Sequence, residues 1–346
     1  METENQHRTS TRTASATMQA IVQDRYGDAG VLHLATIERP TVREHEVLVR
    51  VHAAGLARGD WHLMTGRPYL LRLAFGLRRP RNPVAGGDLA GTVVEVGPAV
   101  TRFDVGDEVF GFGRGTFAEY AVAREDKLAH KPANTTFEQA ATLPVSGLTA
   151  LGAVCDVGRV EAGQKVLVTG ASGGVGGFAV QLAVAAGAEV TGVASTSRLD
   201  LVRSLGADHV LDRTREDFAD GRDHYDLVID LAGNPTISRL RHALAPTGTA
   251  VIVGGEEGGN FSGGLNRQLR ALALSPLVRQ RLTTSLCKEH FTGLERLKDL
   301  VEDGRVKPGI DRVYSLAEAP DAMRRLESGQ VRGKVAITIL ADGPRR

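Results

Sequence analysis

Five glycines fall between positions 170 and 177, in a spacing that suits contact with a phosphate group: Gly170, Gly173, Gly174, Gly176 and Gly177. The pattern G-x-G-x-x-G fits positions 171, 173 and 176, with Ala171 in place of the first glycine. A glycine at 173 lets backbone approach a pyrophosphate, and one at 176 lets a helix pack closely on a strand. The free N–H groups that begin such a helix attract phosphate. The predicted contacts are Gly170, Ala171, Ser172, Gly173, Gly174, Val175 and Gly176.

The segments on either side of this turn decide how strongly the glycine pattern indicates a dinucleotide site. An apolar run at 166–168 predicts a strand buried on both faces, and 190–194 predicts a second one. Between them, small and apolar residues from 178 to 186 predict a helix. Glycine-rich turns also join strands to helices where nothing binds, but this strand–turn–helix–strand context favours a dinucleotide site. The sequence therefore predicts a Rossmann domain.

The residues after the second strand indicate which dinucleotide is bound. A fold that prefers NAD usually has an acidic residue there, which holds the ribose 2′-hydroxyl. Here Ser195, Ser197 and Arg198 occupy the position, and no acid occurs before Asp200. Hydroxyl and guanidinium groups would bind a 2′-phosphate, so the prediction is NADPH. The serines could instead cap a helix that begins near Arg198, and both roles are compatible.

Ligands of doubly wound sheets lie beyond the carboxyl ends of the strands. Further strands are predicted at 209–211, 227–230 and 250–253, with another at 282–286. The residues that follow two of these strands are therefore predicted to lie near the ribose and nicotinamide: Leu231, Ala232, Gly233, Gly254 and Gly255.

The composition of the chain limits which kinds of binding partner are expected. The chain has 346 residues, 42 basic and 41 acidic, and a net charge of +1, so no overall field favours nucleic acid or a membrane surface. A local basic run, Arg72, Arg78, Arg79 and Arg81, is the exception and is interpreted as a solvated surface. With two cysteines far apart and no long apolar run, neither a disulfide framework nor a membrane helix is expected. The predicted location is cytoplasmic.

The order of strand and helix signals predicts two domains in an α/β fold. Short β-type runs with Gly and Pro turns extend from residue 18 to about 135 and suggest an antiparallel, barrel-like unit. Helix and strand signals then alternate, as in a parallel, doubly wound sheet. We assign 136–287 to this Rossmann domain, inserted into a mostly β domain of residues 18–135 and 288–346. Residues 1–17, which are polar, are predicted to be a disordered leader.

A series of short motifs resembles the medium-chain dehydrogenase/reductases, and among them the zinc-free, quinone oxidoreductase-like (zeta-crystallin-like) branch. It covers most of the chain from 18 to 340: residues 90–94 with Gly97, then 106–109, 115–120, 148–150, 170–176, 205–208 and 333–335. The resemblance implies that the mostly β domain is GroES-like and that the protein is a homodimer. The dimer contact would be the edge strand at 282–286.

Zinc-dependent members of this family have a cysteine ligand in the first domain and a Gly-His-Glu segment. Here the corresponding residues are 56–60, Leu-Ala-Arg-Gly-Asp, and Gly86-Gly87-Asp88. Neither glycine nor alanine can ligate zinc, so no metal is predicted.

The resemblance also assigns roles inside the site. Asp60 matches an active-site position, although it could equally cap a short helix at 61–65. Thr149 is expected against the nicotinamide, with an ordinary interior helix threonine as the alternative. Lys334 resembles a basic residue that reaches the 2′-phosphate in some relatives, or it is a surface lysine. Tyr69 is a candidate for stacking on a flat substrate and for proton donation, unless it is a core aromatic.

Without a metal, hydride delivery suits an already electrophilic carbon. The predicted function is therefore an NADPH-dependent, zinc-free oxidoreductase of quinones or α,β-unsaturated carbonyls. Two alternatives stay open: a metal-free alcohol or ketone dehydrogenase of a biosynthetic pathway, and an NADPH-binding sensor without turnover. The shape of the pocket is expected to depend on the loop at 66–82 and the segment at 256–281.

Overall fold

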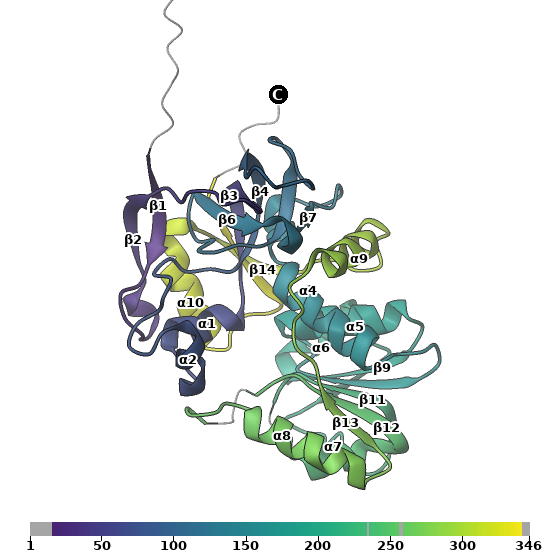
Figure 1. Cartoon of the computed structure of the whole chain (residues 1–346). Helices are drawn as coiled ribbons and strands as arrows, with labels where there is room; N and C mark the ends of the chain where they lie inside the picture. The colour runs from purple at the N-terminus through teal and green to yellow at the C-terminus, as the bar shows by residue number, and fades with distance from the viewer. Residues whose placement is uncertain (1–15, 234, 256–258, 341–346) are drawn as a thin grey trace, which may run out of the picture.

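Two large sheets organise the chain in the computed structural model (Figure 1), which describes residues 16–233, 235–255 and 259–340. The predicted leader lies outside the described residues up to position 15, and Thr17 opens the first strand. Residues 256–258, the start of one predicted pocket segment, also lie outside them.

The six-stranded sheet is parallel throughout and has the order β10-β9-β8-β11-β12-β13. Its central strand β8 carries Val166, Leu167 and Val168, which are fully buried, as a strand covered on both faces requires. The order reverses between β8 and β11, and this switch point is where such sheets bind ligands. The strands are β8 (Lys165–Thr169), β9 (Glu189–Ala194), β10 (His209–Asp212), β11 (Tyr225–Asp230), β12 (Leu244–Ile252) and β13 (Arg281–Thr284).

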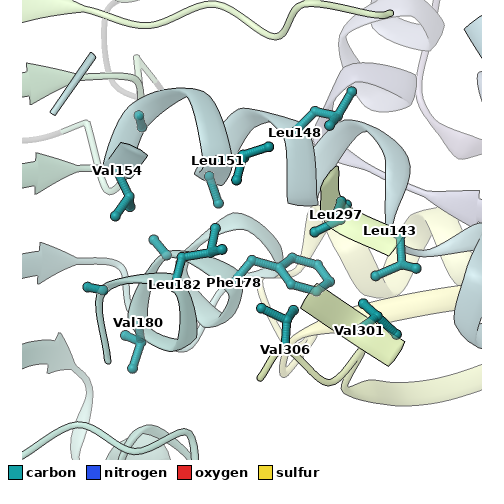
Figure 2. Packing of buried hydrophobic residues seen from close by; sticks show 14 of the residues in the cluster. Leu143, Leu148, Leu151, Val154, Phe178, Val180, Leu182, Leu297, Val301 and Val306 are labelled. Atoms are coloured by element: carbon teal, nitrogen blue, oxygen red, sulfur yellow. The ribbon is translucent and has the colours of Figure 1, made fainter. Parts of the chain in front are cut away.

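Helices connect these strands and cover the sheet. They are α5 (Gly174–Ala185), α6 (Leu199–Ser204), α7 (Ile237–Ala243) and α8 (Leu265–Leu274). On one side, α4 (Pro144–Leu151) and α9 (Phe291–Glu302) pack against α5. Figure 2 shows the Phe178 ring among Leu143, Leu297 and Val301, with Leu182 beside it. This core joins α9, which leads back to the second sheet, to the Rossmann helices.

The second sheet has the order β14-β15-β3-β4-β5-β7, and β6 pairs with β3. Its first strands precede the six-stranded sheet in sequence, and its last two follow it, as an inserted domain predicts. The expected antiparallel pairing holds except between β14 and β15, which are parallel because α10 (Ala319–Glu327) crosses between them. The strands are β3 (Glu46–Leu56), β4 (Asp88–Val96), β5 (Glu108–Phe112), β6 (Tyr120–Arg124), β7 (Leu128–His130), β14 (Ile310–Ser315) and β15 (Lys334–Thr338).

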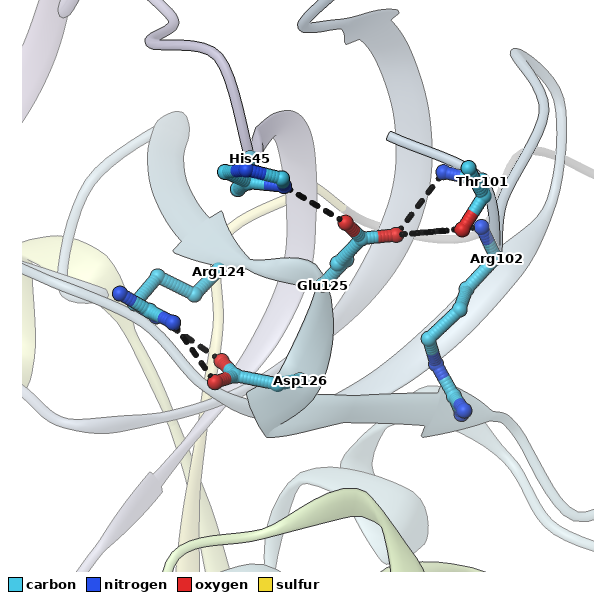
Figure 3. Close-up of polar contacts among 6 residues, drawn as sticks. All are labelled: His45, Thr101, Arg102, Arg124, Glu125 and Asp126. Atoms are coloured by element: carbon cyan, nitrogen blue, oxygen red, sulfur yellow. Dashed lines mark hydrogen bonds and ion pairs between the residues drawn. The ribbon is translucent and has the colours of Figure 1, made fainter. Parts of the chain in front are cut away.

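The remaining elements complete the mostly β domain. They are the antiparallel pair β1 (Thr17–Val22) and β2 (His33–Glu38) and the helices α1 (Arg58–Thr65), α2 (Arg72–Phe75) and α3 (Phe137–Ala141). A polar network fixes its turns (Figure 3): the Glu125 carboxylate accepts from the N–H groups of Thr101 and Arg102 at 2.9 and 3.2 Å. The carboxylate also contacts His45 at 3.2 Å, which ties the turn after β6 to the start of β3.

Candidate active site

A cavity of about 730 Å³ opens at the carboxyl ends of β8, β9 and β11, between the two sheets. The Rossmann side contributes residues that follow those three strands, and the mostly β domain contributes residues at the ends of β3 and β15. Eleven of the residues predicted to bind the cofactor line it: Gly170, Ser172, Gly173, Gly174, Val175, Gly176, Ser195, Arg198, Leu231, Ala232 and Lys334.

The glycine turn has the geometry that a phosphate cradle requires. Gly170 has a φ of +68°, which favours glycine, and Gly173 is the N-cap of α5. A Cβ on Gly176 would lie 2.1 Å from the carbonyl oxygen of Gly170. No side chain caps the helix, so its first N–H groups face the cavity with the glycine backbone around them. The residues of this turn therefore fit the pyrophosphate of a dinucleotide.

We expect Gly176→Ala to weaken dinucleotide binding about tenfold or more, or about 1.4 kcal/mol, because the added methyl pushes α5 away from the turn. Titration of cofactor fluorescence measures this. Gly177→Ala is the matched control, since its Cβ would meet only Leu205 at an ordinary 3.5 Å. Equal affinities of the two variants would contradict the close packing at Gly176.

Buried polar contacts fix the backbone between β8 and β11, where the strand order reverses. The Thr169 hydroxyl donates to Asp230 at 2.7 Å and accepts from the N–H groups of Leu231 and Ala232 at 3.1 and 3.2 Å. Asp230, which is fully buried, forms an ion pair with Arg267 on α8 at 2.6 Å. The same guanidinium donates to the carbonyls of Pro235 and Gly254 at 2.8 Å each. These contacts fix the loops after β11 and β12, and no local pattern in the sequence predicts these roles for Thr169, Asp230 or Arg267.

A cluster of guanidinium groups lines the cavity beyond the end of β9. Arg198 was predicted there; Arg213, after β10, and Arg239, on α7, join it in the structure. Burial lowers the pKa of Arg198, and the neighbouring positive charges of Arg332 and Arg213 lower it further. Arg239 is paired with Asp217 at 2.6 Å. The arrangement concentrates positive charge where a 2′-phosphate is expected.

The serines near Arg198 have different surroundings. Ser195 lines the cavity and is the N-cap of a short 3-10 helix, but its side chain makes no capping bond. Ser197 is exposed and is not among the residues that line the cavity.

Four other residues predicted to contact the cofactor, Ala171, Gly233, Gly254 and Gly255, are not among the residues that line the cavity. Ala171 is buried, and its N–H donates to the carbonyl of Val193 at 3.1 Å. Gly233 has a φ of +78°, and a Cβ on Gly254 would lie 2.2 Å from the carbonyl oxygen of Leu231. Gly255 similarly contacts Gly264. In this structure these residues set the backbone conformation of the loops whose other residues line the cavity.

Two carboxyl groups and one ammonium group are buried at the barrel side of the site. Strands β15, β3 and β4 are neighbours, and their pairing places Val335 opposite Leu56 and Gly55 opposite Asp88. Lys334 and Asp88 are each 3% exposed, and Asp60 on α1 is 8% exposed. The Lys334 ammonium donates to the Leu56 carbonyl at 3.1 Å and to the Ser146 hydroxyl at 2.9 Å.

Burial dominates the titration of this cluster. It raises the pKa of Asp60 to about 6 and that of Asp88 to about 8, and the positive charge of Lys334 only partly offsets it. Burial likewise lowers the pKa of Lys334, while the two carboxyl groups raise it. The cluster can therefore hold or release a proton near neutral pH.

We expect thermal stability to fall as the pH rises from about 4 to about 8, because Asp88 keeps its proton in the folded state and loses it in the unfolded chain. Between these two pH values, folding takes up a proton at Asp88. The stabilisation by the neutral carboxyl is therefore complete at low pH and disappears as the pH rises past the pKa of the folded state. Asp88→Asn should flatten the pH dependence of the melting temperature. Asp299→Asn, an exposed change on α9, should leave it unaltered; a wild-type slope in Asp88→Asn would contradict the assignment.

The three predicted catalytic residues have other partners in this structure. The Asp60 carboxylate accepts from the Ala57 N–H at 2.8 Å, so it caps α1, which begins at Arg58 rather than Trp61. The Thr149 hydroxyl donates to the Val145 carbonyl one turn earlier at 2.6 Å. None of the three, Tyr69 included, is among the residues that line the cavity.

Tyr69 is not a core aromatic. The residue is 42% exposed, and the guanidinium of Arg72 lies over its ring, 4.8 Å from the ring centre. The Lys334 ammonium donates in this structure to the Leu56 carbonyl and the Ser146 hydroxyl, and the contact with the 2′-phosphate that the resemblance implied stays a prediction.

The donor set of the cavity bears on metal binding. None of the described residues that line it is a histidine or a cysteine. Within the described ranges, no group of three or more His, Cys, Asp or Glu side chains is placed to hold a metal ion.

Comparisons with known proteins agree with this architecture. Residues 43–133 match the alcohol dehydrogenase GroES-like domain, and residues 205–337 match a family described as zinc-binding dehydrogenase. The chain is 34% identical to a chloroplast envelope quinone oxidoreductase homolog of Arabidopsis thaliana, over 94% of this chain and 99% of that protein. It is also 34% identical to an NADPH-dependent alkenal/one oxidoreductase, chloroplastic, of the same plant, over 92% of this chain and 79% of that one.

Among solved structures, the quinone oxidoreductase from Coxiella burnetii superposes with a TM-score of 0.83 at 30% identity, covering 93% of this chain and 99% of that one. Identity at this level over nearly the whole of both chains establishes the family. Together with the cavity and its glycine turn, it shows that the chain belongs to the medium-chain dehydrogenase/reductase superfamily, in the quinone oxidoreductase-like branch.

Proposed function

We propose that this protein is an NADPH-dependent reductase of quinones or α,β-unsaturated carbonyl compounds that works without a metal ion. The observation that carries the proposal is the composition of the cavity: a glycine turn, a cluster of arginines and a buried lysine, with neither His nor Cys among the described lining residues. The relatives with quinone and alkenal/one oxidoreductase names support the substrate class.

The preference for NADPH rests on the end of the cavity beyond β9. Ser195 occupies the position where an acidic residue would hold a ribose hydroxyl, and Arg198 and Arg213 line the cavity nearby. Two guanidinium groups can bind a phosphate bidentately, whereas a carboxylate would repel it. The name of one relative, an NADPH-dependent oxidoreductase, agrees with this choice.

Bound NADPH would supply a hydride, and the protein's own residues would orient the acceptor and manage one proton. The Lys334 ammonium has three N–H groups, of which two have partners among the described residues, Leu56 and Ser146. The remaining N–H can donate to a carbonyl or quinone oxygen and stabilise the negative charge that develops there. Ser146, which also lines the cavity, keeps the ammonium in place.

The direct test is NADPH oxidation with a panel of quinones and enones, with NADH and a chelator as controls. The proposal predicts turnover that resists the chelator and prefers NADPH. Tight NADPH binding without turnover on any acceptor would contradict it and favour the sensor. Loss of turnover in the chelator would contradict the metal-free mechanism.

The remaining expectations belong to this proposal. The domain boundaries, 18–135 with 288–346 and 136–287, stay a prediction; they separate the strands of the two sheets but leave α3 (Phe137–Ala141), which packs on the second sheet, on the Rossmann side. A homodimer through the edge strand β13 and a cytoplasmic location stay predictions; light scattering that gives a monomeric mass would contradict the dimer.

A further inference from the structure

Large apolar side chains are exposed unevenly over the molecule. Of the sixteen such residues that are exposed among those described, ten lie in two segments, 63–77 and 261–277. The first segment carries Leu73 at 66% exposure and Leu77 at 68%, with Phe75 between them. The second carries Phe261 at 68% and Leu277 at 81%. Single exposed apolar side chains are ordinary on a protein surface, whereas a large contiguous apolar patch usually marks an interaction site.

The two segments adjoin one another, although nearly 200 residues of sequence separate them. The Tyr69 N–H donates to the Asn260 carbonyl at 2.8 Å, and the Leu70 N–H donates to the Phe261 carbonyl at 3.2 Å. Figure 1 shows the chain before α8 reaching α2 on the side of the molecule that both helices occupy. We call residues 63–81 together with 260–281 the docking face.

Helix α8 presents a regular apolar stripe on this face. Leu265, Leu269 and Leu272 are spaced by four and three residues, so they share one side of the helix, and all three are exposed. The opposite side holds Ala271, which is fully buried. An outward leucine stripe on a helix that already packs through its other side is typical of a surface that meets an apolar phase.

Charge on the docking face has one sign. Between Asp60 and Asp88 the sequence has no acidic residue, and between Glu257 and Glu289 it again has none. Exposed arginines flank the apolar side chains in both segments: Arg67, Arg78, Arg79, Arg81, Arg270 and Arg279. The net charge of +1 conceals this asymmetry because acidic residues elsewhere in the chain balance it.

From these observations we infer that the docking face binds the surface of a lipid bilayer with anionic headgroups. Leucine and phenylalanine side chains would enter the boundary between headgroups and acyl chains, and arginines would bind lipid phosphates. Among the described residues no helix is long and apolar enough to cross a membrane. A second copy of the chain on this face fits less well, because it would bring the same arginines face to face; the predicted homodimer uses the edge strand β13 (Arg281–Thr284), which shares only Arg281 with the docking face. This revises the interpretation of the basic run at 72–81 as a solvated surface and the expectation of no membrane contact.

Vesicle sedimentation with the full chain tests the inference. We expect binding to phosphatidylglycerol vesicles that falls as salt is raised and is weak on phosphatidylcholine vesicles. The double variant Leu269→Glu with Leu272→Glu should lower the partition coefficient about tenfold or more. The control, Val105→Glu with Val313→Glu, changes exposed apolar residues outside the face and should bind as the wild type does.

Three results would overturn the inference: no binding to phosphatidylglycerol vesicles, equal loss in the control, or an effect of the leucine changes on oligomeric state instead. The last would appear in light scattering as a wild-type dimer that the leucine variant dissociates, and it would assign the face to a second copy. None of these readouts depends on NADPH turnover, so the inference fails or holds separately from the proposed reductase.

Discussion

Lys334→Met is expected to lower kcat about 10²- to 10³-fold, the usual effect of removing a donor to a developing oxyanion. The change keeps most of the side-chain volume and removes the ammonium that contacts Leu56 and Ser146. The fold should tolerate the loss of charge, because burial already raises the pKa of Asp88 to about 8 and that carboxyl can take up a proton. Steady-state kinetics with an enone, beside the melting temperature of the variant, provides the measurement.

The affinity for NADPH distinguishes the two roles of Lys334. If the ammonium acts on the acceptor, kcat falls while the dissociation constant of NADPH changes little. If it binds the 2′-phosphate, as the resemblance implies, the dissociation constant of NADPH rises and that of NADH does not. The second pattern with an unchanged kcat would contradict the role proposed here.

The double variant Arg198→Ala with Arg213→Ala, which removes both arginines beyond β9, is expected to have the second large effect, on the affinity for NADPH. Hydrogen bonds to charged groups contribute about 1.5–3 kcal/mol each, so NADPH affinity should fall by a factor of about 10² or more. NADH lacks the 2′-phosphate and should bind nearly as before. The ratio of the two dissociation constants, measured by fluorescence titration, reports the specificity directly.

Arg215→Ala is the matched control for that experiment. Arg215 follows Arg213 by two residues, is 76% exposed along its side chain and lies 3.9 Å from Asp212, but it does not line the cavity. It should leave both affinities unchanged. Parallel weakening of NADPH and NADH in the double variant would mean that the arginines support the fold of the site rather than the phosphate.

The central strands of the Rossmann sheet could be predicted from the sequence because they are buried on both faces. Strands β8, β9 and β11 each contain a short apolar run, and the β8–turn–α5–β9 unit carries its own glycine pattern. The start of β12 could not be predicted in the same way. The strand begins at Leu244, six residues before the predicted 250, and this first part contains Pro246 and Gly248, which indicate a turn.

The polar part of the site was less predictable because distant segments build it. Arg213 follows the third strand and reaches the cavity only because β10 pairs with β9. Lys334 and Asp88 are brought to one place by the pairing of β15 with β3 and of β3 with β4. Local residue patterns carry no information about such contacts, so the sequence did not predict that Lys334 and Asp88 are buried near one another.

The most direct test of the central proposal follows the hydride. NADPH that carries deuterium at the transferable C4 position is supplied with an enone, and the product is analysed by mass spectrometry and NMR. The account predicts deuterium on the β-carbon of a saturated ketone, with the second hydrogen, derived from solvent, on the α-carbon. Deuterium on the carbinol carbon of an allylic alcohol would instead mean carbonyl reduction and would contradict the proposed reaction.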